Sequence, residues 1–144
     1  MNEQATSTTD IARTLASDIA IRASEADRLG KLPDEDIQAL RASGYLTLSV
    51  PTEYGGHGLS LRDCVAAHLE LAQGNVSTAL VAAMQLQVFG YIRETRPWPE
   101  PIFEKFCHAA VEDGALFNLL FCDVFELKDA KIKRLISYLV EVSQ

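Results

Sequence analysis

The sequence is short of positive charge. Its 144 residues include 13 Lys and Arg side chains against 20 Asp and Glu side chains, which gives a formal net charge of −7 at pH 7. A protein that binds nucleic acid gains much of its affinity by neutralising phosphates with basic side chains. The charge balance therefore argues against nucleic acid as a partner.

Cysteine is scarce as well. The three cysteines, Cys64, Cys107 and Cys122, form no C-x-x-C pair and no spacing typical of a metal site. We expect buried, reduced thiols and no metal. Residues 1–10 lack the basic start and the apolar core of an export signal, so the sequence predicts a cytoplasmic protein.

Charged residues are absent between Glu70 and Arg93, a stretch long enough to cross a membrane. It nevertheless holds several polar residues that would lack hydrogen-bond partners in lipid. They are Gln73, Asn75, Ser77, Thr78, Gln85 and Gln87. We therefore predict no membrane span, but a helix buried inside a soluble protein.

What the sequence does contain is typical of one globular domain with its own core: 48% of the residues are hydrophobic and 23% are charged. Apolar residues at helical spacing, with caps and breakers, predict five helices before Gly114 and an extended connection over 45–51. The expected helices follow Thr8–Asp10, begin at Pro33, follow Ser60, run from about Val76 to Glu94, and contain residues 102–110.

The residues after Gly114 have a different character. Aromatic and β-branched residues crowd into 116–127 and favour a strand. Residues 128–131 then fit a hairpin turn, with a second strand over 132–142. The same second segment also fits helical spacing, so strand or helix stays open for residues 131–142. Four basic side chains at the start of such a helix weaken the helical alternative.

Residues 44–58, with the sequence GYLTLSVPTEYGGHG, carry the most specific pattern in the chain. The segment resembles the motif G-[hydrophobic]-x-x-x-x-V-P-x-E-x-G-G-x-G of acyl-CoA dehydrogenases and related flavin monooxygenases. Residues 69–79 are similar to the family's acidic helix end that is followed by a serine or threonine opening the next helix. The resemblance covers about residues 11–118.

The resemblance implies a mainly α fold: a helical bundle of about five helices, as in the N-terminal domain of that family, with a C-terminal extension. We expect a flexible N-terminus over 1–10, the helical domain over 11–118 and the extension over 119–144. Residues 121–138 resemble the last hairpin of nuclear-transport-factor-2-like and polyketide-cyclase-like proteins, which favours a β-hairpin.

In the resembling family, FAD and the catalytic base are held mainly by a middle β-domain and C-terminal helices, which have no counterpart in this sequence. We therefore assign no catalytic, cofactor-binding or metal-binding residue, and expect FAD not to be bound by this chain alone. The family's N-terminal domain forms one wall of an acyl pocket. The matching residues are Ala79, Leu80, Ala83, Met84 and Gln87, although an uncharged, alanine-rich helix is also typical of simple core packing.

Two functions remain open. The chain is either a truncated or rearranged flavin oxidoreductase domain that lacks the machinery for turnover, or a non-catalytic interaction module. A detached domain of this kind would expose apolar surface, which proteins seldom leave uncovered. We therefore expect a homo-oligomer or a complementary protein chain as partner, and an acyl thioester as ligand only in a complete assembly.

Overall fold

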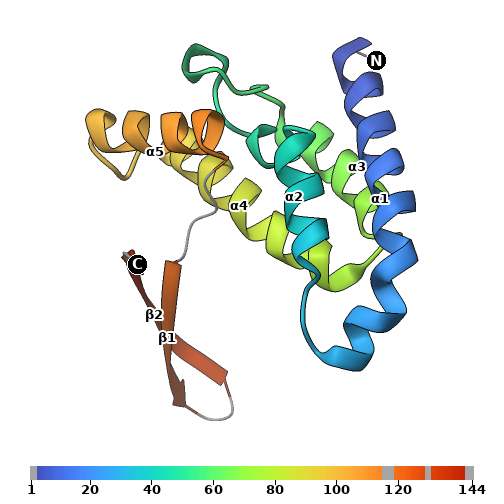
Figure 1. Ribbon diagram of the computed structural model, residues 1–144. Helices are drawn as coiled ribbons and strands as arrows, with labels where there is room; N and C mark the ends of the chain where they lie inside the picture. Colours follow the sequence, from blue (N-terminus) through green and yellow to red (C-terminus); the bar gives the residue numbers. More distant parts are fainter. Residues whose placement is uncertain (1–2, 115–118, 129–130, 142–144) are drawn as a thin grey trace.

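A computed structural model describes the backbone of residues 3–114, 119–128 and 131–141, and the side chains of residues 8–114. Five α-helices are followed by a two-stranded antiparallel hairpin (Figure 1). The mainly α fold predicted from the sequence is confirmed. The elements are α1 (Glu3–Leu29), α2 (Asp34–Ala42), α3 (Leu61–Leu71), α4 (Val76–Thr95), α5 (Glu100–Glu112), β1 (Leu119–Lys128) and β2 (Lys131–Glu141).

The first helix begins earlier than the sequence predicts. α1 starts at Glu3, so the start expected after Thr8–Asp10 is wrong, and residues 3–10 are helical where a flexible segment was expected. Residues 3–5 are Glu, Gln and Ala, which all have high helix propensity. The helix therefore continues through the two threonines instead of being capped by them.

The connection after α2 is also different from the prediction. Residues 45–47 form a 3-10 helix (η1, Tyr45–Thr47) rather than an extended segment, and a second one follows (η2, Thr52–Tyr54). Gly44 adopts a φ of 71°, which glycine takes at little cost, and its carbonyl accepts the amide of Thr47. The left-handed conformation of Gly44 directs the chain into η1. The alternation of leucines in the sequence could not predict this conformation.

The C-terminal segment is a hairpin. β1 and β2 pair in antiparallel register, from Leu119 with Glu141 to Lys128 with Lys131, with an irregularity between Glu126 and Leu127. Residues 131–141 are therefore a strand and not the helix that was the alternative. The expected turn residues Asp129 and Ala130 lie outside the described residues.

Two hydrophobic clusters hold the helices together. The larger one joins α1, α2, α3 and the first half of α4 around residues such as Ile19, Leu40 and Leu71. The smaller one joins the second half of α4 to α5 around Phe89 and Phe103. α4 contributes to both clusters and runs from the end of the bundle next to α1 to the end next to α5 (Figure 1).

A buried ion pair connects α1, α2 and α4. Asp36 is fully buried, and its carboxylate accepts a hydrogen bond from Arg22 Nε at 2.7 Å and another from Thr78 Oγ1 at 2.8 Å. Arg22 also binds Asp18 on α1. A buried carboxylate is tolerated only where donors replace the lost water, and both donors are present here.

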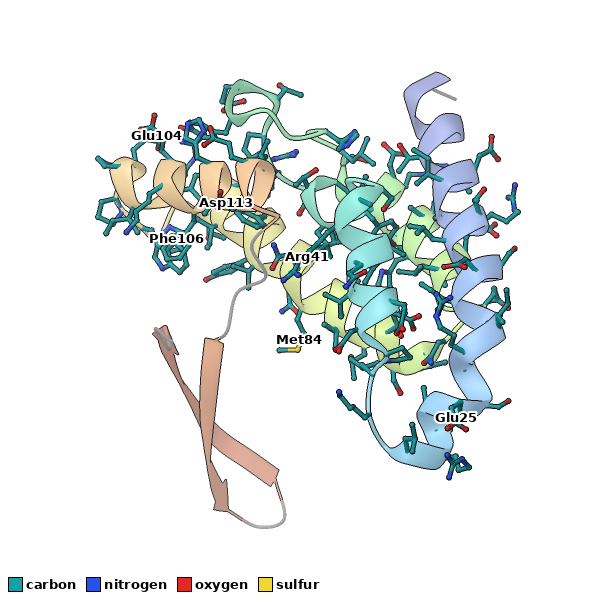
Figure 2. The ribbon with its side chains drawn as sticks, viewed as in Figure 1. Glu25, Arg41, Met84, Glu104, Phe106 and Asp113 are labelled. Carbon is teal, nitrogen blue, oxygen red and sulfur yellow. The ribbon has the colours of Figure 1, made fainter. Side chains whose placement is uncertain are left out.

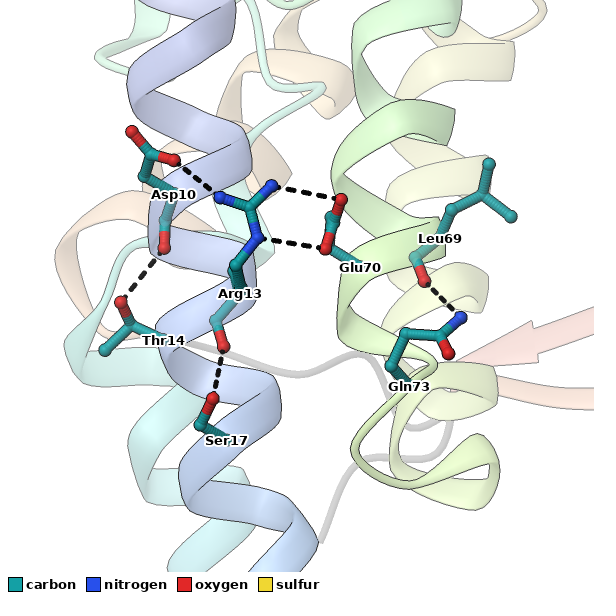
Figure 3. A network of polar contacts seen from close by, with 7 residues as sticks. All are labelled: Asp10, Arg13, Thr14, Ser17, Leu69, Glu70 and Gln73. Carbon is teal, nitrogen blue, oxygen red and sulfur yellow. Dashed lines mark hydrogen bonds and ion pairs between the residues drawn. The ribbon is translucent and has the colours of Figure 1, made fainter.

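A second ion pair joins α1 to α3 at the surface. The guanidinium of Arg13 lies between Asp10 of its own helix and Glu70 of α3, as Figure 3 shows. Two of its nitrogens contact the two oxygens of Glu70 at 3.3 and 3.2 Å. The fork geometry sets the relative register of the two helices, although exposed pairs of this kind add little stability.

None of the helices in the described part of the chain has the length and apolar character that a membrane crossing requires. α4, the uncharged helix singled out in the sequence, packs instead against α2, α3 and α5.

Candidate functional site

α4 is the element on which the predicted pocket residues lie. Asn75 caps its first turn, because the side-chain oxygen accepts the amides of Ser77 and Thr78. The helix is apolar around most of its circumference, which is typical of a helix that is surrounded on all sides. Among the residues whose side chains are described, however, one side of it is uncovered: Leu80 is 64% exposed and Tyr91 is 60% exposed.

The five predicted pocket residues separate into three groups. Ala79 is buried in the larger hydrophobic cluster. Ala83 and Gln87 line a cavity of about 540 Å³ between α3 and α4. Leu80 and Met84 do not line this cavity and lie on the exposed side of α4; Figure 2 shows the Met84 side chain projecting outward from the helix.

The cavity has an apolar wall on each side. Leu61, Val65 and Leu69 line it from α3, at a spacing of four residues that places them on one face. Ala83 and Gly90 line it from α4. The α3 wall was not identified from the sequence, although a signal was present: α3 has a buried apolar face at Cys64, Ala67 and Leu71 and a second apolar face beside it.

Polar groups at the floor of the cavity are paired within the chain. The Ser49 hydroxyl donates to the carbonyl of Leu86 at 2.9 Å. The Tyr45 hydroxyl and His68 Nδ1 lie 3.1 Å apart. Burial lowers the pKa of His68, while the backbone carbonyl of Ala79 acts in the opposite direction. His68 is therefore held neutral, with its Nδ1 placed to accept the hydroxyl of Tyr45.

Two further titratable groups of the cavity, Cys64 and Arg93, also have structural partners. Burial raises the pKa of the Cys64 thiol, so this cysteine is not an activated nucleophile. Arg93 donates to the Leu59 carbonyl at 3.2 Å, and its Nε lies 3.4 Å from the carboxylate of Glu94. The cavity thus contains no arrangement of base and nucleophile.

The glycine-rich turn over 55–58 does not fit a phosphate or a flavin. Its four amides all donate to carbonyls of the preceding segment, so none is available to an anion. A Cβ at Gly56 would lie 2.3 Å from the Val50 carbonyl oxygen, which is why glycine is required there.

His108 and the acidic residues around it on α5 lie at the surface. His108 is placed between Glu104 and Glu112 on α5, and the ring of Tyr54 packs edge-on against it. The Tyr54 hydroxyl binds Glu100, and this hydrogen bond is the main cause that raises the pKa of Tyr54 to about 12. Among the side chains of residues 8–114, no three of the types His, Cys, Asp and Glu are grouped as a metal site.

Comparison with known proteins identifies the family. Residues 1–95 match the family model described as the acyl-CoA dehydrogenase N-terminal domain. YdbM of Bacillus subtilis, whose name describes an acyl-CoA dehydrogenase, is 36% identical over 104 residues, which is 72% of this chain and 27% of that protein. SfnC of Pseudomonas putida, named as an FMNH2-dependent monooxygenase, is 35% identical over 66% of this chain and 26% of its own length.

Solved structures show the same fold. The FMN- and indole-bound structure of TdsC from Paenibacillus sp. A11-2 superposes with a TM-score of 0.71 over 93% of this chain and 43% of that chain, at 19% identity. The nitrososynthase of Micromonospora carbonacea superposes with a TM-score of 0.71 over 90% of this chain and 36% of that chain, at 24% identity.

The chain spans about a quarter of the length of the curated relatives that it matches. The family model covers α1 to α4 of the helical bundle, including the glycine-rich turn and the start of α4. The chain therefore belongs to the acyl-CoA dehydrogenase family, and its residues 1–95 are the N-terminal helical domain of that family.

Proposed function

We propose that this chain supplies one wall of the acyl pocket of a flavin oxidoreductase, and that the flavin site and the catalytic base come from outside residues 1–144. The flavin, FAD or FMN, would accept a hydride from the substrate. The part assigned to this chain is to bind the apolar portion of the substrate and to exclude water from it. In this proposal the chain alone does not turn over substrate.

The exposed side of α4 is the observation that carries the proposal. Leu80 and Met84 are 64% and 42% exposed, and they lie beside Ala83 and Gln87 on a helix without a charge before Arg93. Isolated exposed apolar residues are common, but an uncharged helix with a continuous uncovered side needs a partner. An acyl chain held against this side would cover it.

Cofactor binding is proposed for another segment because the described residues offer no cradle for the flavin phosphates. The amides of the glycine-rich turn are already paired, as shown above. The name of SfnC describes an FMNH2-dependent enzyme, and the structure of TdsC, which has the same fold, contains FMN. We expect the purified chain to lack visible flavin absorbance after incubation with FAD or FMN and desalting, and retained flavin would contradict this part of the proposal.

Chain-length preference tests the proposed wall. In an enzyme reassembled with the complementary segments, Ala83→Phe should shift the preference toward shorter acyl thioesters, because the ring would fill space beside α4. The measurement is kcat/KM across a series of acyl chain lengths. Ala66→Phe, at an exposed α3 position outside the cavity, is the matched control. An unchanged preference in Ala83→Phe would remove this side of α4 from the pocket.

The second candidate function is a non-catalytic interaction module, or subunit, that self-associates or pairs with another chain. It is favoured by a second uncovered stripe, formed by Leu61 and Leu69 of α3, which are 81% and 63% exposed. Light scattering as a function of protein concentration measures the oligomeric state and thereby tests the interaction module against the acyl-pocket wall. Self-association supports the module, whereas a monodisperse monomer at high concentration counts against self-association.

A further inference from the structure

Within the described residues, the hairpin has no strand partner at either of its outer edges. β1 and β2 pair with each other and form a two-stranded sheet, which Figure 1 shows as a ribbon after α5. An isolated hairpin is marginally stable in water, and an unpaired edge offers a row of backbone donors and acceptors to another strand. The hairpin is therefore a surface onto which a further strand can pair.

The sequence of the two strands is typical of strands inside a larger sheet. Successive residues of a strand belong to opposite faces of the sheet. The register places the pair Phe121–Leu139 on one face and the pair Val124–Ile136 on the other. Strands that are apolar on both faces are usually found well inside a sheet, so these two strands need more than each other.

Two charged residues of β2 have no charged partner in the register of the hairpin. Arg134 lies opposite Glu126. Glu141, in contrast, lies opposite Leu119, and the register shift leaves Lys133 without a partner on β1. Lys133 and Glu141 thus stand at the two ends of the regular part of β2. A second β2 strand running antiparallel would bring the basic end of one copy to the acidic end of the other.

One symmetric register pairs these charges over the whole regular part of β2. In a two-fold pair of antiparallel strands one residue lies opposite its own copy, because opposing residues share a face of the sheet. When the register is centred on Ser137, Lys133 lies opposite Glu141 twice, and Ile136 lies opposite Tyr138 twice. Opposite charges, and an aromatic beside a β-branched residue, are favourable cross-strand pairs. No two charges of the same sign lie opposite each other in this register.

The edge of β1 offers no comparable pairing with its own copy. A symmetric register centred on Asp123 places this carboxylate opposite itself, which is unfavourable. A register centred on Val124 places Glu126 opposite Cys122 and brings no opposite charges together. The β2 edge is therefore the one that fits a second copy of the chain.

We propose that two copies of this chain dimerise through the free edge of β2, in the register centred on Ser137, and form one four-stranded sheet in the order β1-β2-β2-β1. The proposal goes beyond the acyl wall and does not rest on it. It also uses a different surface from the Leu61 and Leu69 stripe of α3, so the two kinds of self-association can be tested separately.

Charge reversal in the full 144-residue chain tests the pairing, with the dimer dissociation constant measured by sedimentation equilibrium. Glu141→Lys should raise the constant at least about tenfold, because both Lys133–Glu141 pairs become pairs of like charge. Lys133→Glu combined with Glu141→Lys should restore it to within about threefold of the wild-type value. Glu104→Lys, the same change at an exposed position of α5, should leave it unchanged.

Disulfide formation tests the register directly. Ser137→Cys in a Cys122→Ser background should give a disulfide-linked dimer under mild oxidation, because residue 137 lies opposite its own copy. Cys64 and Cys107 are buried. Lys133→Cys in the same background is the control, since the two copies of residue 133 would lie about 26 Å apart at about 3.3 Å per residue. A crosslink in the control but not in Ser137→Cys would overturn the register.

The outcomes separate this dimer from the other proposals. A monomer at every concentration, an unchanged constant in Glu141→Lys, or a double variant as weak as the single one would overturn the strand pairing. Loss of association in Leu69→Ser without an effect of Glu141→Lys would also overturn it and would support the α3 stripe instead. The acyl wall is decided independently, by the chain-length preference of Ala83→Phe.

Discussion

Single buried polar residues are where the helical bundle is most sensitive to change. Asp36 lies at a helix start, where the sequence indicates only a favourable interaction with the helix dipole. The structure gives it a different role, because it is fully buried and joins Arg22 of α1 to Thr78 of α4. The partner residues lie 14 and 42 positions away, so local pattern could not identify them.

Removal of the Asp36 carboxylate is therefore expected to destabilise the fold. Asp36→Ala should lower the free energy of unfolding by about 3 kcal/mol, because it leaves a partly buried guanidinium and a buried hydroxyl without their acceptor. Urea unfolding followed by circular dichroism measures the change. Asp18→Ala, which removes the half-exposed partner of the same arginine, should cost less than about 1 kcal/mol. Equal losses in the two variants would contradict the assigned role.

The neutral state of His68 predicts a dependence of stability on pH. Burial lowers the pKa of His68 in the folded chain below its ordinary value of 6.5, so the unfolded chain binds the proton more tightly. The stabilisation is fully present above 6.5 and is lost as the pH falls from there through the folded pKa. The urea midpoint should therefore drop more between about pH 7.5 and pH 5.5 in the wild type than in His68→Gln. Identical drops would show that His68 is not held neutral by the fold.

At the scale of elements, two glycines show how neighbouring elements constrain α4. Gly74 lies in the turn before the helix, and Gly90 lies in its second half, where it lines the cavity. The two glycines have opposite environments. A Cβ at Gly74 would lie 2.4 Å from the carbonyl oxygen of Ala16 on α1, whereas a Cβ at Gly90 would make only an ordinary contact, with Ser49 Cβ at 3.9 Å.

This contrast predicts opposite effects of the same substitution. Gly74→Ala should lower the free energy of unfolding by about 2 kcal/mol, because α1 has to move away from the turn. Gly90→Ala should raise it by up to about 1 kcal/mol, because alanine is the better helix former. Thermal unfolding of the two variants next to the wild type measures both changes. A stabilised Gly74→Ala variant would mean that α1 does not approach this turn.

Most elements could be predicted from the sequence because their signals are local. The spacing of apolar residues, the Ser60 and Asn75 caps and the prolines before α5 all act within a few residues. The predicted start of α1 was wrong because the capping signal of Thr8–Asp10 is weaker than the tendency of the preceding residues to continue the helix. The prediction also failed at η1, where the left-handed Gly44 turns the chain.

At the scale of the whole molecule, the helices and the hairpin are stabilised by different contacts. Both hydrophobic clusters are formed by residues between Ala12 and Val111. A two-stranded sheet has little stability of its own in water.

The superposition on TdsC covers 93% of this chain, so it must include part of the hairpin, since residues 1–118 make up only about four fifths of the sequence. The similarity to nuclear-transport-factor-2-like hairpins stays a prediction, as does the cytoplasmic location.

A shortened chain of residues 1–114 tests whether the helices are stable without the hairpin. We expect it to keep a cooperative thermal transition within a few degrees of that of the full chain, because both clusters remain complete. Circular dichroism at a helix-specific wavelength follows the transition. A non-cooperative transition in the shortened chain would show that the helices depend on residues 115–144.

The proposed acyl wall and the cavity show most clearly what local sequence pattern cannot predict. The uncharged stretch before Arg93 was visible in the sequence, and so were the five residues expected to face an acyl chain. Which side of α4 stays open depends on how α2, α3 and α5 pack against it. Ala79 is buried while Leu80, its neighbour in sequence, is exposed, and only packing distinguishes them.

The sequence by itself determined the family, the mainly α class and the order of the helices, because each of these follows from residues close together in the chain. The tertiary structure alone decided the burial of Asp36, the pairing of His68 with Tyr45 and the cavity between α3 and α4. These features join residues that are distant in sequence, and their free energies come from contacts that form only when the helices pack.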